Sequence, residues 1–237
     1  MMPVEIKLED NVAIVTLDEG ENRLNLDFLT KFLEALDHVE KHTNANVLVV
    51  RSAHEKIFSN GIDLEWLMPI MQKNDRETAA KFIETMMALF RRIALYPMIT
   101  IAAITGHAFA GGAIMCCYFD FRFMRSDRGF ICFPEVDLGI PFLPGMMTAM
   151  KKAIPRYKLD EMVLTGKRVT AQECLEHRII IGAGHIDQLM DDVMGFARLQ
   201  NKRRPVVELI KAEMNKEIIH AIDYEDKPII ESGRFYV

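Results

Sequence analysis

The feature that most constrains the fold is a glycine-rich turn between two apolar segments. Residues 106–112 read Gly-His-Ala-Phe-Ala-Gly-Gly, after an apolar, β-branched stretch at 98–104 and before a small, apolar stretch at 110–117. This order predicts a buried strand whose glycine turn opens into a helix. The first N–H groups of a helix lack partners within it and lie at the positive end of its dipole, so the turn is a candidate anion or oxyanion site. The alternative is that the glycines only allow tight strand-to-helix packing.

One carboxylate lies within an apolar segment further along the chain. Glu135 is flanked by Phe133, Pro134, Val136 and Leu138. Apolar surroundings raise the pKa of a carboxylic acid, and a group with a raised pKa exchanges protons near neutral pH. Glu135 is therefore a candidate acid–base group, the alternative being an exposed carboxylate in a loop.

A third segment completes a set of motifs. Residues 59–64 read Ser-Asn-Gly-Ile-Asp-Leu, shortly after an apolar strand predicted at 46–51. Together with the glycine turn and with Pro-Glu-Val-Asp-Leu-Gly at 134–139, this segment resembles the signature of the enoyl-CoA hydratase/isomerase (crotonase) superfamily. The order and approximate spacing of the three motifs match, and the resemblance covers nearly the whole chain.

The resemblance implies an α/β fold, a crotonase-like spiral of ββα units with a C-terminal helical region. Residues 1–185 are expected to form the spiral core with the acyl-CoA site, and residues 186–237 the helical region. In the family these last helices pack over a neighbouring subunit and help to close the site. A homo-oligomer, a trimer or a hexamer, is therefore implied.

The family's reactions pass through an enolate-like oxyanion on a thioester carbonyl. Two preorganised N–H donors aimed at that oxygen contribute on the order of several kcal/mol. By resemblance the donors are the backbone N–H groups of Ile62 and Gly111, and Glu135 is the acid–base group. A carboxylate beside the α- and γ-carbons removes a proton from one and returns it to the other.

One departure from the family pattern bears on the reaction. The family's hydratases carry a second glutamate on the helix after the glycine turn, where this chain has Ile114. Isoleucine cannot activate water, which favours a one-base 1,3-proton shift over hydration. The chain is also similar to short Δ3,Δ2-enoyl-CoA isomerases, through Phe-Ser-Asn-Gly-x-Asp-Leu at 58–64, Met-Arg-x-Asp-Arg-Gly at 124–129 and Glu-Val-Asp-x-Gly at 135–139.

The leading hypothesis is therefore an isomerase that shifts a double bond in an enoyl-CoA from Δ3 to Δ2. Another thioester reaction on the same scaffold, such as hydration, hydrolysis or decarboxylation, is the runner-up, because a fold does not fix a function. A catalytically silent binding protein, or an RNA-associated relative, is the alternative of a different class.

The resemblance also places a group of residues beside the substrate or its coenzyme A portion: Arg23, Ser59, Asn60, Gly61, Asp63, Leu64, Trp66, His107, Gly112 and Ile114. Four of them have particular roles or structural alternatives. Asp63 is expected mainly to cap the following helix, and Trp66 either lines an acyl pocket or belongs to the core. His107 is expected to be structural rather than to contact ligand. Arg23 is a candidate partner for a phosphate. The basic run at 202–204 meets such phosphates or faces solvent.

Composition limits the partners and cofactors. The chain of 237 residues has a net charge of −5, which argues against a nucleic-acid surface. Its four cysteines lie in apolar or helical stretches without metal-ligand spacing, so they are expected to be buried and reduced. No metal or redox cofactor is called for, and coenzyme A enters only as part of the substrate. Neither a signal peptide nor a run of eighteen apolar residues is evident, so no membrane association is expected and the cytoplasm is the default location.

The remaining elements follow from periodicity and capping. The alternating pattern of residues 4–17 predicts a hairpin, and Asp27 is expected to cap a helix. Residues 75–96 are expected to form a long amphipathic helix that ends before Pro97. Further strands are expected at 120–124 and 129–133, and further helices at 145–153, 159–164, 186–200 and 205–221.

Two points near the C-terminus are less regular. Thr170 and Glu173 have the spacing of a capping box. The tail after Tyr224 has few apolar repeats and receives no assignment.

Overall fold

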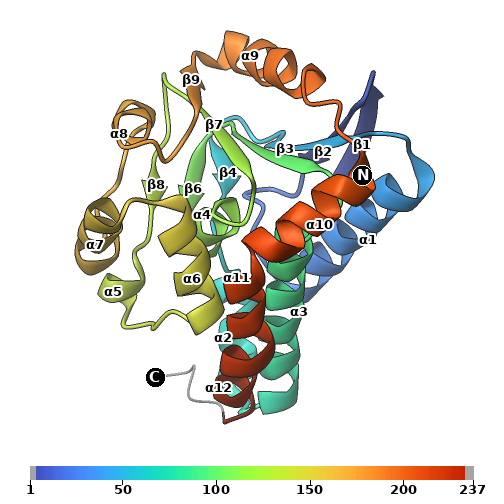
Figure 1. The fold of residues 1–237 in the computed structure, drawn as a ribbon. Coiled ribbons are helices and arrows are strands. Elements are labelled where there is room, and N and C mark those ends of the chain that lie inside the picture. Colours follow the sequence, from blue (N-terminus) through green and yellow to red (C-terminus); the bar gives the residue numbers. More distant parts are fainter. Residues whose placement is uncertain (1–3, 233–237) are drawn as a thin grey trace.

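The computed structural model describes residues 4–232, which form two β-sheets surrounded by helices (Figure 1). The larger sheet has the strand order β1-β2-β3-β5-β7-β9. Only β1 and β2 pair antiparallel, as the predicted hairpin, and the other neighbours are parallel. Its strands are β1 Val4–Glu9, β2 Val12–Leu17, β3 Val47–Ser52, β5 Ile99–Ile104, β7 Phe121–Arg125 and β9 Gly182–Gly184.

The smaller sheet explains the spiral. It contains β4 (Ile57–Ser59), β6 (His107–Phe109) and β8 (Ile131–Cys132), all parallel. In the chain, β3–β4, β5–β6 and β7–β8 are consecutive pairs, and each pair is followed by at least one helix. Each unit therefore gives one strand to each sheet, which produces the predicted succession of ββα units.

The glycine turn differs from the prediction in one respect. The chain does not pass directly from the turn at Gly106 into a helix, because β6 comes first and α4 begins only at Gly111 (Gly111–Cys116). Residues 107–109 pair with both β4 and β8. Backbone pairing on two sides thus makes a strand of a three-residue segment that has no strand pattern of its own.

Helices cover both faces of the larger sheet. Side chains of β3 alternate between the faces: Leu48 and Val50 join the core that contains α1 (Leu26–His42) and α3 (Arg76–Ala94), whereas Val47 and Val49 face α9 (Ile186–Arg198). Figure 1 shows α9 on one side of the sheet and α1 and α3 on the other. This confirms the strand expected near residues 46–51 as one buried on both faces, the pattern of parallel sheets covered by helices.

Two predicted helix boundaries are corrected. Asn25, not Asp27, caps α1, since the Asn25 side chain accepts a hydrogen bond of 3.0 Å from the Phe28 N–H. Asp27 instead forms an ion pair with Lys31 one turn later. The long helix begins after its cap at Asp75 as expected, but it ends at Ala94 rather than at residue 96.

The capping box is also only half formed. Thr170 accepts a hydrogen bond of 3.4 Å from the Glu173 N–H and caps α8 (Ala171–Glu176). The Glu173 carboxylate does not return to the cap, because it binds the ammonium groups of Lys158 and Lys167. An ion pair with two cations therefore outcompetes the backbone N–H.

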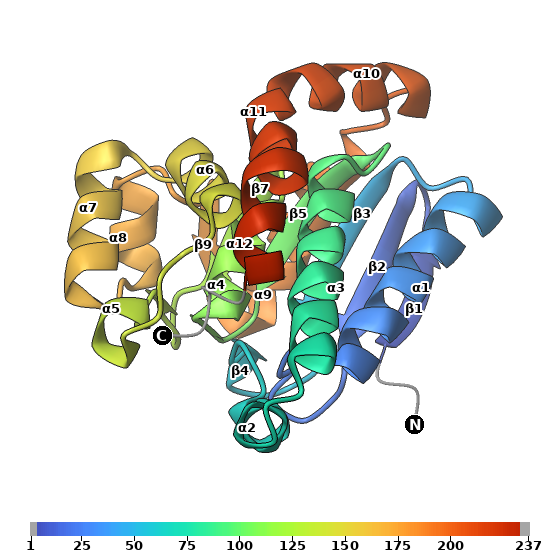
Figure 2. The ribbon, with the colours of Figure 1, turned by 90° about the horizontal axis from the view of Figure 1, so that it is seen from below.

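The chain ends in a column of helices that includes the unassigned tail. The helix predicted at 205–221 is divided into α10 (Arg204–Met214) and α11 (Lys216–His220), a π-helix η1 (Ala221–Asp226) follows, and α12 (Lys227–Ser232) closes the described chain. Asn215 marks the division, because its side chain donates to the Ala94 carbonyl and accepts from the Lys152 ammonium. The last part of the tail lies outside the described residues. In Figures 1 and 2 the part of this column that follows α10, made of α11, η1 and α12, runs between α3 and α6 (Pro144–Ala153).

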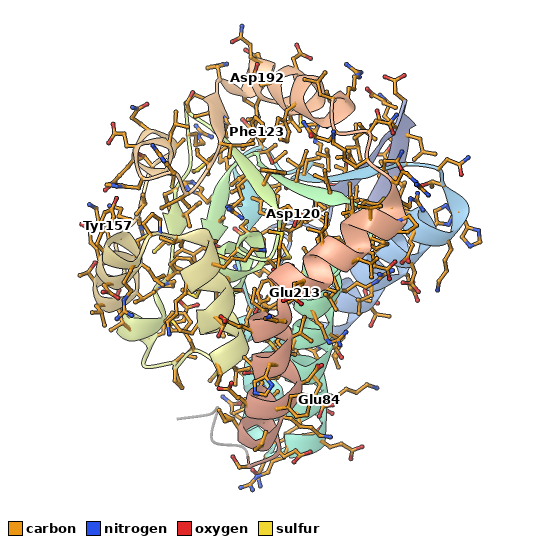
Figure 3. The ribbon with its side chains drawn as sticks, viewed as in Figure 1. Glu84, Asp120, Phe123, Tyr157, Asp192 and Glu213 are labelled. Atoms are coloured by element: carbon orange, nitrogen blue, oxygen red, sulfur yellow. The ribbon has the colours of Figure 1, made fainter. Side chains whose placement is uncertain are left out.

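A buried ion pair fastens this column to the sheet. The Lys211 ammonium lies 2.8 Å from the Asp120 carboxylate and also donates to the Met98 carbonyl at 3.2 Å. Asp120, labelled in Figure 3, lies between the sheet and α10. Since α9 packs on the sheet itself, the region expected from residue 186 consists of one core helix and a separate helical column after it.

Candidate active site

Two backbone segments lie side by side: the loop at 60–63 is the first, and the junction of β6 and α4 is the second. Leu24 bridges to the first segment, with its N–H donating to the Gly61 carbonyl at 2.8 Å and its carbonyl accepting from the Asp63 N–H at 3.0 Å. Because successive backbone groups of an extended chain point in opposite directions, the N–H of Ile62 between them points away from Leu24.

The second segment is the junction of β6 and α4, and it touches the first at glycine. Gly61 has φ +75°, and a Cβ there would lie 2.8 Å from the Phe109 carbonyl oxygen and 3.0 Å from the Gly111 nitrogen. Only glycine permits both this conformation and this approach. Ala110, just before α4, is held at φ +49°, a strained conformation for a residue with a side chain.

Two N–H groups are left free by this arrangement. Within residues 4–232, neither the Ile62 N–H nor the Gly111 N–H donates a hydrogen bond to a protein acceptor. Gly111 is the first residue of α4, where helix N–H groups have no partner within the helix. A Cβ on Gly111 would lie 3.7 Å from Ile62 Cγ1, so the two residues are direct neighbours.

A pocket opens beside these groups. Its lining is mostly apolar and comes from several helices, the end of β6 and the loops between them: Asn60, Ile62, Leu64, Met86, Phe109, Ala110, Gly111, Ile114, Glu135, Leu138, Ile140, Pro141, Phe142 and Met146. Among these lining residues Glu135 is the one that carries an ionisable side chain. An apolar pocket with a few convergent polar groups is the usual form of a small-molecule site.

The local structure fixes Glu135 at the pocket wall. It is the first residue of the short helix α5 (Glu135–Leu138), which ends at Gly139 with φ +67°. The side chain is 6% exposed, and its Oε2 atom has no hydrogen-bond partner among the described residues. Burial raises the pKa of Glu135 to about 7. At neutral pH the group therefore exists in both protonation states, as a proton shuttle requires.

The structure brings six of the sequence-predicted residues into the pocket lining: Asn60, Ile62, Leu64, Gly111, Ile114 and Glu135. Others support them from behind. The Ser59 hydroxyl donates to the Asn22 carbonyl at 2.7 Å, and a Cβ on Gly112 would lie 2.5 Å from the Ser59 carbonyl oxygen. Asp63 caps α2 (Leu64–Gln72) by accepting from the Trp66 N–H at 3.2 Å, as expected.

Three other predicted residues lie outside the lining and away from this support. Trp66 packs on Phe82 with ring centroids 5.3 Å apart and is part of the core packing. His107 packs on Phe130 at 4.3 Å, which fits its expected structural role. Arg23 forms an ion pair with Glu21.

The basic run at 202–204 has a mixed environment. The Arg204 guanidinium donates to the carbonyl groups of Glu40, Thr43 and Ala45 at 2.6 to 2.8 Å. It therefore binds the C-terminal end of α1 and its following turn, where carbonyls lack helix partners. The expectation that the run faces solvent holds for Lys202 and Arg203, which are exposed, and is wrong for Arg204. Phosphate binding by the run stays a prediction.

Sequence reasoning missed the far wall of the pocket. Met86 lies on the helix expected at 75–96, but no sequence pattern placed it, Phe142 or Met146 at a pocket. Their shared signal is apolar character, which does not distinguish a pocket wall from a core.

Three further observations concern metal-ligand clusters, cysteines and long apolar helices in residues 4–232. Residues 4–232 contain no group of three or more His, Cys, Asp or Glu side chains arranged to hold a metal ion. The four cysteines are free and buried. In the same residues no helix has both the length and the hydropathy needed to cross a bilayer.

Comparison with known sequences identifies relatives along most of the chain. The profile of a family described as Enoyl-CoA hydratase/isomerase matches residues 7–224. Enoyl-CoA delta isomerase 2, peroxisomal, from Arabidopsis thaliana is 30% identical over 185 residues, which cover 76% of this chain and 75% of the relative. The human enoyl-CoA hydratase domain-containing protein 3, mitochondrial, is 27% identical and covers 91% of this chain and 70% of the relative.

Solved structures share the fold. A probable enoyl-CoA hydratase from Mycobacterium tuberculosis H37Rv has a TM-score of 0.87 at 21% identity, over 98% of this chain and 95% of the other. An apo enoyl-CoA isomerase from the same bacterium has a TM-score of 0.86 at 21% identity, covering 98% of both chains. These likenesses confirm the predicted crotonase-like α/β fold.

Proposed function

Because the chain belongs to the enoyl-CoA hydratase/isomerase family, we propose that it moves the double bond of an enoyl-CoA thioester from the Δ3 to the Δ2 position. One observation carries the proposal. Glu135 is the ionisable side chain among the residues that line the pocket, and it shares that pocket with the free N–H groups of Ile62 and Gly111. A single acid–base group beside an oxyanion site suits a proton shift within one substrate.

In the proposed reaction the thioester carbonyl oxygen accepts hydrogen bonds from Ile62 and Gly111. The Glu135 carboxylate removes a proton from the α-carbon, and the electron pair of the broken C–H bond forms a dienolate. Protonated Glu135 then returns the proton to the γ-carbon, so the double bond moves from C3–C4 to C2–C3. Each oxyanion donor in such sites contributes about 3 to 4 kcal/mol of transition-state stabilisation.

The surroundings of Glu135 suit this shuttle. A general base works best when its pKa lies near the working pH, because it then accepts and releases the proton with similar ease. Burial brings the pKa of Glu135 to about 7. Ile114 lies in the same pocket and provides no second carboxylate to activate water.

Product analysis tests the reaction type. Purified protein is incubated with a medium-chain 3-enoyl-CoA, and products are separated and weighed by mass spectrometry. The proposal predicts conjugated 2-enoyl-CoA of unchanged mass. In a parallel incubation with a 2-enoyl-CoA, a gain of one water by a protein that leaves the 3-enoyl-CoA unchanged would indicate hydration. Free CoA would indicate hydrolysis, and lack of thioester binding would revive a non-catalytic role.

The proposed function includes a substrate class, an oligomeric state and a cellular location. An acyl-CoA is the proposed substrate, with coenzyme A as part of it and no separate cofactor. A homo-oligomer and a cytoplasmic location stay predictions from the sequence. Light scattering of the purified protein and localisation of the tagged chain would test them.

A further inference from the structure

A buried carboxylate lies at the end of the π-helix, outside the pocket. Asp226 is the last residue of η1 and is fully buried. Its Oδ1 atom accepts a hydrogen bond of 2.8 Å from the Gly145 N–H, and its Oδ2 atom has no partner among residues 4–232. Burying a carboxylate with one acceptor unsatisfied is unfavourable by several kcal/mol, so an apolar residue would be the more stable choice here.

The contact supplies the missing cap of α6. Leu143 is the N-cap residue of α6 and offers no side-chain acceptor to the first N–H groups. Asp226 supplies one from a segment 81 positions away in sequence, and its negative charge lies at the positive end of this ten-residue helix. Gly145 permits the contact, because a Cβ there would lie 2.5 Å from Asp226 Oδ2 and 2.6 Å from Ile222 Cγ1.

The same end of α6 forms the far wall of the pocket. Phe142 and Met146 flank Gly145 in the chain, and both line the pocket. Met87 approaches the Cβ position of Gly145 to 3.2 Å, and its neighbour Met86 lines the pocket from α3. In Figure 2 the helical column lies against both α3 and α6. Asp226 therefore binds the end of α6 whose neighbouring residues line the same pocket as Glu135 and the two residues with free N–H groups.

We propose that Asp226 is a positioning residue: through the Gly145 amide it fixes the α6 wall of the pocket and thereby limits the length of the acyl group that the enzyme accepts. The inference rests on the proposed function, since it takes the pocket as the acyl site. Side chains of η1 and α3 pack against Gly145 rather than leaving open space, so a longer acyl chain requires α6 to shift relative to η1. The Asp226 contact opposes that movement.

The test is a selectivity series. The ratio of kcat/KM for a long-chain 3-enoyl-CoA to that for a short-chain one is measured for wild type and for Asp226→Leu, which fills the space without an acceptor. Because one methylene of pocket length changes kcat/KM by about tenfold or more, we expect the ratio to rise by at least about tenfold. A folded Asp226→Leu variant with the wild-type ratio would overturn the inference.

Matched variants separate the contact from general effects of η1. Asp226→Asn keeps an acceptor for the Gly145 N–H and is expected to keep the wild-type ratio. Asp223→Asn, on the same π-helix, breaks the exposed ion pair with Arg91 at 3.0 Å and is also expected to leave the ratio unchanged. A tenfold change in either variant would contradict a role that runs through the Gly145 amide.

Two further measurements keep the inference testable. Met146→Ala enlarges the pocket directly, and an unchanged ratio there would show that this pocket is not the acyl site, which is a failure of the proposed function instead. If Asp226→Leu does not fold, hydrogen exchange of the Gly145 amide is measured in the wild-type protein. Protection close to that of core amides is expected, and the rapid exchange of an uncapped helix end would overturn the inference.

Discussion

Burial of Glu135 gives the carboxyl group a pKa suited to proton transfer and lowers the stability of the folded state at neutral pH. A carboxylate that is 6% exposed and has no cation among its hydrogen-bond partners resists ionisation, which is why its pKa is raised to about 7. The unfolded chain holds the same group at its ordinary pKa of 4.5. Between these two values the folded state binds more protons than the unfolded state, so stability is lost as pH rises through this window.

This linkage predicts that Glu135→Gln stabilises the protein at pH 8. The neutral amide avoids the penalty of a buried charge, which is on the order of 3 kcal/mol for a pKa raised from 4.5 to about 7. At pH 4, where the carboxyl group is protonated in both states, variant and wild type are expected to have similar free energies of unfolding. Urea unfolding at the two pH values measures the difference, and an equal difference at both would contradict the burial argument.

The same raised pKa predicts the pH dependence of catalysis. The free enzyme needs Glu135 ionised to act as base, so kcat/KM is expected to rise about tenfold per pH unit up to pH about 7 and then level off. A pH profile of isomerisation at low substrate concentration measures this limb. Constant kcat/KM down to pH 5 would exclude a base with this pKa.

Among the elements, the contact between the loop at Gly61 and the start of α4 is the most demanding. Gly61→Ala would place a Cβ 2.8 Å from the Phe109 carbonyl oxygen and 2.9 Å from Ala110 Cβ. The two backbones would have to separate, and with them the N–H groups of Ile62 and Gly111. Because removing one oxyanion donor lowers kcat by about 100-fold to 1,000-fold, we expect a kcat loss of at least about 100-fold in this variant.

Gly20→Ala is the matched control for that substitution. Gly20 also has a positive φ, +51°, but a Cβ there would meet nothing within 4 Å. The control therefore carries the strain of a left-handed residue, about 1 to 2 kcal/mol, without the steric clash. It is expected to lower the unfolding midpoint and to leave kcat unchanged, and a similar kcat loss in both variants would refute the proposed geometry.

Helices and strands with a clear hydrophobic periodicity or a helix-capping residue were predictable from the sequence. Elements that depend on tertiary pairing with distant segments were not. The hairpin, the fully buried β3 and the long helix α3 follow from local patterns that tertiary packing reinforces. The strand β6 is three residues long and exists because it pairs on both sides. Likewise the Glu173 carboxylate does not complete its capping box, because it binds Lys158, fifteen residues away in sequence, and Lys167.

The pocket shows the same division between local and tertiary information. Glu135 and Gly111 were found because their motifs are contiguous in sequence. Met86 lies on α3, Phe142 lies in the segment before α6, and Met146 lies on α6. These residues meet only through the packing of the whole fold. No local pattern marks such a wall.

At the scale of the whole molecule, the ββα units place the two motif-bearing segments next to each other, and the C-terminal column closes the structure behind them. The column was only partly predictable, since the π-helix η1 and its buried Asp226 depend on contacts with α6. The ion pair between Lys211 and Asp120 fastens the column to the sheet.

Breaking that pair is expected to loosen the column. Lys211→Met leaves the largely buried Asp120 carboxylate with its hydrogen bonds from Thr100 but without its cation. In buried ion pairs, loss of one partner lowers the free energy of unfolding by about 3 to 5 kcal/mol. Lys216→Met removes the exposed ion pair with Glu213 and is expected to leave the free energy of unfolding nearly unchanged, because solvent screens such pairs. Urea unfolding of both variants measures this, and similar values for the two would show that the column is not held through Lys211.

The central claim is that Glu135 moves the proton. The most direct measurement compares isomerisation of a 3-enoyl-CoA by wild type, Glu135→Gln and the control Asp137→Asn, whose carboxylate lies exposed on the same short helix. Binding of a non-reactive acyl-CoA is titrated in parallel. We predict that Glu135→Gln loses at least about 100-fold in kcat, as loss of an acid–base group does, while it still binds the ligand and Asp137→Asn stays active. Wild-type turnover by Glu135→Gln would contradict the account.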